Sequence, residues 1–251
     1  MSMEHRQPAA RAAAPVAPVA PVAPAAPADD EVLERLWRER YSCRAFLPDP
    51  VPRETITRLL TLAQRTASWC NSQPWQLAIL SGAALERFRT ALYAHVAAQA
   101  EGASDFPFPR EYQGSALARR RESGFQLYDT LKIVRGDKAA YRQQMLENFR
   151  LFGAPHVAII TSDEALGVYG AVDCGAYVSS FLLAAQALGV ATIAQAALAG
   201  YAGFVKAHLG LGPDRSMVCG ISFGYADRAH PVNSYRTSRA AVTEAATFLE
   251  N

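Results

Sequence analysis

Residues 68–75 read Ser68-Trp69-Cys70-Asn71-Ser72-Gln73-Pro74-Trp75, and the chain continues as Gln-Leu-Ala-Ile-Leu80. The first part is a polar loop that Pro74 closes, and Trp75 to Leu80 has the composition of a β-strand. Amide side chains in such a loop can bond the edge of a heteroaromatic ring, and an indole can cover its face. The alternative is a polar turn whose tryptophans only anchor it in the core. For the loop taken alone, this alternative is favoured.

Upstream lies Arg40-Tyr41-Ser42-Cys43-Arg44. In an extended chain Arg40, Ser42 and Arg44 point to the same side, because strand side chains alternate. Two guanidiniums flanking a hydroxyl match the oxygens of a phosphate. Arg236-Thr237-Ser238-Arg239 offers the same groups near the other end. A basic strand edge is the commoner explanation of either cluster alone, but together they make an anionic ligand about equally plausible.

Helical and strand patterns alternate along the remaining chain. Asp29 or Asp30 can cap a first helix, and Asp137 can cap another that runs to about Phe152. Apolar residues at helical spacing predict three amphipathic helices: Val32, Leu33, Leu36 and Trp37; Ile56, Leu59, Leu60 and Ala63; and Leu85, Phe88, Leu92 and Val96. Three further strands are predicted over 156–161, 190–193 and 216–224. The order predicts mixed α and β structure in one domain.

An uncharged run from Cys174 to Val205 has the length of a membrane span. Gly189 divides it, however, and favours a buried helix followed by a buried strand. The helix carries many small residues, including Gly175 and Ala176, which would allow close packing on another helix, perhaps one from a second subunit.

Residues 101–136 mix aromatic and basic side chains and include Pro107 and Pro109. They are predicted to form a partly helical excursion on the surface of the domain. It is interpreted either as a solvated insertion or as a lid over a pocket.

The composition and net charge exclude several classes of protein. Lysine plus arginine number 25 and aspartate plus glutamate 23, so the net charge is 25 − 23 = +2, with 50% apolar residues. These values exclude a disordered chain and disfavour non-specific binding to nucleic acid. The cysteines Cys43, Cys70, Cys174 and Cys219 are far apart, which predicts reduced thiols in a cytoplasmic protein and no metal site. A Rossmann glycine motif and a P-loop are absent from the sequence.

Residues 1–29 are predicted to be a disordered tail rich in alanine, proline and valine, and residues 30–251 the folded domain. The Pro-Val-Ala triplets of the tail favour polyproline II, and their prolines interrupt any run that could serve as a signal sequence. The tail is either dispensable, which is favoured, or a proline-rich ligand or spacer.

Four motifs occur together in order: Arg-x-Ser-x-Arg at 40–44, Ser-x-x-Asn-x-Gln-Pro-Trp at 68–75, Gly-Ala-Pro at 153–155 and Gly-x-Ser-x-Gly-Tyr at 220–225. This combination resembles the flavin-dependent nitroreductase family over residues of about 30–240. The first two motifs are fairly specific, and the last two are weak alone.

The resemblance implies an α+β fold in which helices wrap a mostly antiparallel sheet. It implies an intertwined homodimer whose C-terminal arm crosses to the partner, with two FMN molecules at the interface. It also implies NADPH or NADH as hydride donor and a small aromatic electron acceptor. The chemistry would belong to the flavin, so no catalytic side chain is required.

The resemblance also assigns roles to residues. Arg40, Ser42 and Arg239 would hold the FMN phosphate, with Arg236 a weaker candidate and Tyr41 within the same motif. Arg44 would lie near the pyrimidine edge of the flavin. Ser68, Trp69, Cys70 and Asn71 would contact the flavin from the partner subunit, with Gln73 supporting the loop. The family's Pro-x-Glu-Gly segment corresponds here to Ala194-Gln195-Ala196-Ala197, so a main-chain N–H of Ala196 or Ala197 would face flavin N5.

The acceptor would be selected by aromatic residues of the lid, namely Phe106, Phe108, Tyr112, Phe125 and Tyr128. Reduction of a nitroaromatic compound to the hydroxylamine or amine is the leading expectation. The alternatives are an enone reductase, a reductive dehalogenase or a flavin-cleaving enzyme of the same fold, a flavin-binding module without turnover, and a protein without flavin.

Overall fold

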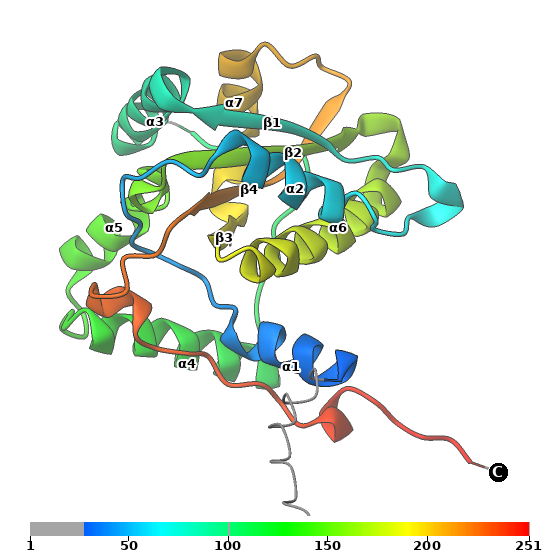
Figure 1. The fold of residues 1–251 in the computed structure, drawn as a ribbon. Helices are drawn as coiled ribbons and strands as arrows, with labels where there is room; N and C mark the ends of the chain where they lie inside the picture. The colour runs from blue at the N-terminus through cyan, green and yellow to red at the C-terminus, as the bar shows by residue number, and fades with distance from the viewer. Residues whose placement is uncertain (1–27, 100, 251) are drawn as a thin grey trace, which may run out of the picture.

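Four strands form an antiparallel sheet at the centre of the chain (Figure 1). They are β1 (Gln76–Ser81), β2 (His156–Asp163), β3 (Ala191–Gln195) and β4 (Arg215–Gly224), in the order β1-β2-β4-β3. Every neighbouring pair is antiparallel, as predicted. This computed structural model describes residues 28–99 and 101–250. Residues 1–27 of the predicted tail lie outside the described residues, and Asp29 already belongs to the first helix.

Helices cover both faces of the sheet, because the buried strands present apolar side chains alternately to each side. On β2, Ala158 and Ile160 pack with α2 (Arg53–Ala63) and α6 (Gly167–Ala187). Val157 and Ile159 pack on the other side with α3 (Gly82–Ala97) and α7 (Ala202–Leu209), and α5 (Lys138–Leu146) contributes Leu146 there. The result is three layers with two apolar cores.

The long uncharged run is a buried helix followed by a strand, as predicted. By length and composition the segment Glu164–Ala187 could cross a membrane. In the fold, however, Cys174, Tyr177 and Phe181 of α6 are fully buried against the sheet. Gly189 then ends the helix with a φ of 71°, a left-handed conformation that glycine adopts without cost.

Two helices lie apart from the sheet. Figure 1 shows α1 (Asp29–Glu39) and α4 (Gly114–Thr130) below the three layers, with the C-terminal arm running past them. The expected amphipathic helix at α1 forms, but it buries no residue, and Leu33 and Trp37 are 47% and 45% exposed. The surface excursion at 101–136 is partly helical, as predicted, since it contains α4.

Two predicted helix ends are wrong. The N-cap of α1 is Ala28, whose main-chain N–H donates to Glu31, so Asp29 and Asp30 lie inside the first turn instead of capping it. Asp137 does cap α5 through a 2.9 Å bond from the Ala140 N–H, but this helix ends at Leu146 and not near Phe152. The reason is that Leu151 and Phe152 adopt left-handed φ values of 57° and 52°.

Candidate functional site

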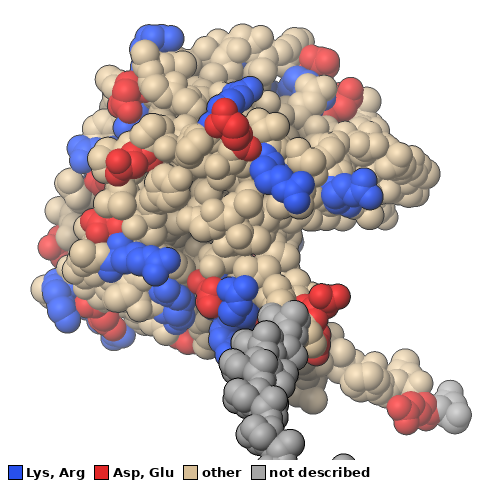
Figure 2. All heavy atoms as spheres, in the orientation of Figure 1, with Lys and Arg blue, Asp and Glu red and all other residues tan. Residues whose placement is uncertain are grey.

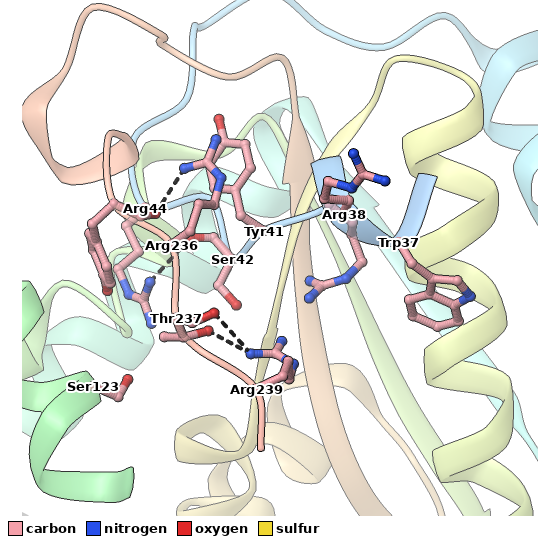
Figure 3. A pocket seen from close by; sticks show the side chains of 11 residues that line it. Trp37, Arg38, Tyr41, Ser42, Arg44, Ser123, Arg236, Thr237 and Arg239 are labelled. Atoms are coloured by element: carbon pink, nitrogen blue, oxygen red, sulfur yellow. Dashed lines mark hydrogen bonds between the residues drawn. The ribbon is translucent and has the colours of Figure 1, made fainter. Parts of the chain in front are cut away.

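Arginines from both ends of the described chain line one cavity of about 490 Å³. Figure 3 shows side chains of α1, of the segment after it and of the C-terminal arm converging there. The predicted residues Arg40, Tyr41, Ser42, Arg44, Arg236 and Arg239 are all brought together in this arginine pocket, joined by Trp37, Arg38, Ser123, Tyr235 and Thr237.

The segment 40–44 runs alongside the edge of the sheet. Ser42 forms a parallel bridge with Thr192 of β3, and the Cys43 N–H donates to the Thr192 carbonyl at 3.0 Å. Cys43 is therefore fully buried, while Arg40, Ser42 and Arg44 line the cavity. Arg40, Ser42 and Arg44 thus share one cavity, as predicted, but Tyr41 lines it as well, so the alternation of side chains is not strict.

Asn233 fastens the two ends of the chain to each other. Its Oδ1 accepts the Arg44 N–H at 2.8 Å, and its Nδ2 donates to the carbonyls of Ala45 and Asp227, both at 2.8 Å. Asn233 is buried, so these bonds are shielded from water. This clasp places Tyr235 to Arg239 beside the 40–44 segment, and sequence motifs gave no signal for it.

The pocket is strongly electropositive. Burial, and then the charge of Arg239, lowers the pKa of Arg40 from its usual value. The Arg236 guanidinium lies 3.7 Å from the centre of the Tyr41 ring, and Arg239 donates to Thr237 Oγ1 at 2.9 Å. Within the described residues, Arg40, Arg44, Arg236 and Arg239 form no ion pair with a carboxylate. This donor set therefore fits a phosphate-sized anion.

A second cavity, of about 330 Å³, shares Arg44 with the arginine pocket. The end of β3 forms one wall of this inner cavity, including the predicted Ala196 and Ala197. Asn148 and Phe152 form another wall, and Tyr128 comes from α4. An elongated ligand with an anionic end in the arginine pocket could thus extend past Arg44 into the inner cavity.

The Gly-Ala-Pro and Gly-x-Ser-x-Gly-Tyr motifs pack against each other, with Pro155 against Gly224. A Cβ at Gly224 would clash with the Pro155 ring, and one at Gly220 would clash with Leu198. Ser222, between these glycines, is fully buried and donates to Gln195 Oε1 at 2.5 Å. The motifs therefore let neighbouring segments approach β4 closely at the end of the sheet.

The Ser68–Gln73 loop lies elsewhere and lines neither cavity of the same chain. It is the projection at the right of Figure 1, at the start of α6. Asp173 of α6 accepts the Trp69 N–H at 3.2 Å, and Ser68 Oγ accepts the Gln73 N–H at 2.9 Å. Trp69 is 62% exposed, with its ring 4.7 Å from that of Tyr169.

Most of the predicted lid residues also lie outside the two cavities. Of the five aromatic candidates, only Tyr128 lines the inner cavity, where it stacks on Tyr141 at 4.4 Å. Arg120 lies over Tyr112 and Arg135 over Phe125. The remaining two, Phe106 and Phe108, line neither cavity, and Phe108 lies near Gly200. The structure therefore does not bring four of the five candidates to the site within one chain.

Sequence reasoning missed several wall residues. Trp37 was interpreted only as part of the apolar face of the first helix, and Arg38 was given no role, although both lie just before the Arg40 motif. Tyr235 and Thr237 flank Arg236 and were within reach of the same reasoning. Gln144, Met145, Asn148 and Phe152 carry no motif that would mark them. Across residues 28–99 and 101–250 no cluster of metal-binding side chains is found.

Comparisons with known proteins agree with this geometry. The model of the Nitroreductase family matches residues 37–225. Nitroreductase NfnB of Mycolicibacterium smegmatis is 40% identical over 222 residues, which cover 87% of this chain and 93% of the relative. The 4-nitrobenzoate reductase of Pseudomonas putida is 32% identical, covering 80% of this chain and 88% of the relative.

A solved structure shows the same likeness in three dimensions. The crystal structure of the FMN-dependent nitroreductase NfnB from Mycobacterium smegmatis in complex with NADPH superposes with a TM-score of 0.84. Its sequence identity is 37%, and the match covers 88% of this chain and 99% of that one.

Proposed function

The chain belongs to the nitroreductase family, and on that premise we propose that it is an FMN-dependent NAD(P)H oxidoreductase that reduces nitroaromatic compounds. The observation that carries the proposal is the arginine pocket, which shares Arg44 with the inner cavity. Relatives named for reduction of nitrobenzoate and nitrobenzene support the substrate class.

The chain's part is to grip and orient the cofactor. Arg40, Ser42 and Arg239 would hold the phosphate, assisted by Arg236, which Tyr41 keeps in place by stacking. Arg44, at the junction of the cavities, would lie near the pyrimidine edge, where its charge favours an anionic reduced ring. The N–H groups of Ala196 and Ala197 line the wall that would face flavin N5.

When bound, FMN supplies two-electron chemistry, taking a hydride from NAD(P)H and passing it to the acceptor. Reduction of a nitro group to a hydroxylamine takes two hydrides and two protons and releases one water. Tyr128 would contribute a face on which an aromatic acceptor stacks. The choice between NADPH and NADH is part of the proposal, and the NADPH named for the NfnB structure favours NADPH.

A homodimer is also part of the proposal. α6 exposes an apolar stripe in which Val168, Tyr169 and Val172 are 71%, 63% and 59% exposed. Figure 2 shows that the projection carrying the Ser68–Gln73 loop is largely uncharged, whereas charged side chains are scattered over the rest of that face. An apolar surface of this kind favours a partner. A second copy would cover it and bring Ser68, Trp69, Cys70 and Asn71 to the other subunit's flavin, with Gln73 supporting their loop.

A cytoplasmic location completes the proposal. Cys43, Cys70, Cys174 and Cys219 are all free thiols, and burial raises the pKa of Cys43 and Cys174 to about 11 and that of Cys219 to about 12. Thiols held protonated in this way suit a reducing compartment.

The test is anaerobic titration of the purified protein reconstituted with FMN. We expect NADPH to bleach the flavin absorbance and 4-nitrobenzoate to restore it, with two NADPH consumed per hydroxylamine. Arg239→Ala should weaken FMN binding at least about tenfold through loss of a charge-assisted contact. Arg121→Ala, which removes an exposed arginine outside both cavities, should not. Failure to bind FMN, or turnover of enones but not nitro compounds, would overturn the proposal.

A further inference from the structure

We propose that Gln195 is a positioning residue: its buried carboxamide fixes the wall of the inner cavity against which the flavin ring would rest. This inference rests on the proposed function for its effect on turnover. The contacts that carry it belong to the chain itself.

Gln195 joins three segments that are far apart in the sequence. Its Oε1 accepts the Ser222 hydroxyl of β4 at 2.5 Å, and its Nε2 donates to the Asn148 carbonyl at 2.8 Å. Gln195 is 2% exposed and Ser222 is fully buried, so the bond between their side chains is shielded from water, while the bond to the Asn148 carbonyl is partly buried. The amide orientation follows from the partners, because the Asn148 carbonyl can only accept.

The segment that Gln195 holds is strained. The Asn148 carbonyl also accepts the Leu151 N–H at 3.1 Å, and this bond closes the turn in which Leu151 and Phe152 are left-handed. This conformation is unfavourable for non-glycine residues, because it brings Cβ too close to the following carbonyl oxygen. Such a turn persists only where its surroundings determine it strongly. Gln195 supplies one of these restraints at the carbonyl where the turn begins.

Two of the segments that Gln195 joins also line the inner cavity. Asn148 and Phe152 line the inner cavity together with Gln195, Ala196 and Ala197, and Gln195 immediately precedes those two alanines. One side chain therefore ties the end of β3 to the turn that carries Phe152. Displacement of the wall by about 1 Å would be enough to lower the rate of a transfer that depends on orientation.

The decisive variant is Gln195→Glu, which keeps the shape but replaces the Nε2 donor with an oxygen. That oxygen would oppose the Asn148 carbonyl and break the restraint. The matched control is Gln144→Glu, which introduces the same charge at another residue lining the inner cavity. No hydrogen bond joins the Gln144 side chain to the turn among the described residues. Gln195→Met removes the bonds at similar volume without adding charge, and covers the case in which Gln195→Glu does not fold.

Hydrogen exchange of the apo protein tests the restraint without the cofactor. We expect faster exchange at residues 148–153 in Gln195→Glu and Gln195→Met, and wild-type exchange in Gln144→Glu. Unchanged exchange in both Gln195 variants would overturn the inference, whether or not the protein binds flavin.

With FMN bound, we expect both Gln195 variants to shift the visible flavin spectrum and to lower kcat about 10- to 100-fold. The FMN dissociation constant should change little, because the phosphate grip is intact. A wild-type spectrum and kcat in both variants would overturn the inference while leaving the proposed function standing. Wild-type protein that does not take up FMN would instead refute the proposed function.

Discussion

Two turns among the described residues each place more than one non-glycine residue in the left-handed region, and their surroundings differ. In the exposed loop, Cys70, Asn71 and Gln73 have φ values of 51°, 55° and 47°. In the buried turn, Leu151 is fully buried and Phe152 is 7% exposed. Core packing offsets the backbone strain of the buried turn. The exposed loop is held mainly by hydrogen bonds to Asp173 and by hydrogen bonds within the loop. Strain without burial fits a loop whose packing is completed by another molecule, as the proposed dimer requires.

The largest effect is expected from Leu151→Ala. Removing a fully buried leucine leaves a cavity beneath the turn, so the free energy of unfolding should fall by about 2–5 kcal/mol. Urea denaturation measures this loss. Leu33→Ala on exposed α1 is the control and should stay within about 0.5 kcal/mol of the wild type. Equal losses in the two variants would show that the buried turn does not depend on core packing.

A smaller effect is expected from Asp173→Asn. The Trp69 N–H would bond a neutral amide oxygen in place of a charged carboxylate, which should cost about 1 kcal/mol in local stability. Hydrogen exchange should therefore accelerate at residues 69–73 while the rest of the chain keeps its protection. Asp137→Asn, which weakens the comparable cap of α5, should leave the loop unaffected. Protection of the loop in Asp173→Asn would contradict its dependence on hydrogen bonds.

A buried histidine, His156, lies shortly after the buried turn and can titrate. His156 follows Pro155, and its Nε2 accepts the Val51 N–H at 2.9 Å, so the ring is neutral with its proton on Nδ1, 2.6 Å from Ser81 Oγ. Burial lowers the pKa of His156 below its usual 6.5. The unfolded chain therefore binds this proton first, and stability should fall as the pH drops below 6.5, by at most about 1.4 kcal/mol per pH unit.

Thermal unfolding of the wild type and His156→Gln between pH 7.5 and about 5 isolates this contribution. The variant should be less stable at neutral pH but lose less stability on acidification. Parallel pH profiles would argue against His156 as the titrating group.

The smallest effect is expected from Cys70→Gly. Glycine relieves the left-handed strain but makes the unfolded chain more flexible, so the net gain should be below about 1 kcal/mol. Cys70→Ala keeps the strain and serves as the control in the same thermal measurement. A loss of stability in the glycine variant would mean that the Cys70 side chain makes a contribution of its own.

Local sequence patterns predicted the order of elements and much of the arginine pocket. The apolar spacing of α2 and α3 depends on neighbours three and four residues away, and the Arg40 motif depends on simple alternation along an extended chain. These relations are short-range and visible in the sequence.

Long-range polar contacts were not predictable in the same way. Asn233 and Gln195 each bond at least one partner more than 40 residues distant, brought close only by the folded sheet. The early end of α5 was missed because Leu151 and Phe152 enter the left-handed region ahead of Gly153, and neither residue type normally marks the end of a helix. Of the lid aromatics only Tyr128 lines the inner cavity of the same chain, and composition alone does not tell which residues of 101–136 lie beside it.

The Asn233 clasp has a consequence for biosynthesis. Because the anion pocket needs both the segment after α1 and the arm that ends in Arg239, a nascent chain has only half of it until that arm leaves the ribosome. The interior strand β4 is translated only shortly before that arm, so the sheet and the anion pocket are completed almost together. Loading of a phosphate-bearing molecule is thus deferred to the last stage of maturation.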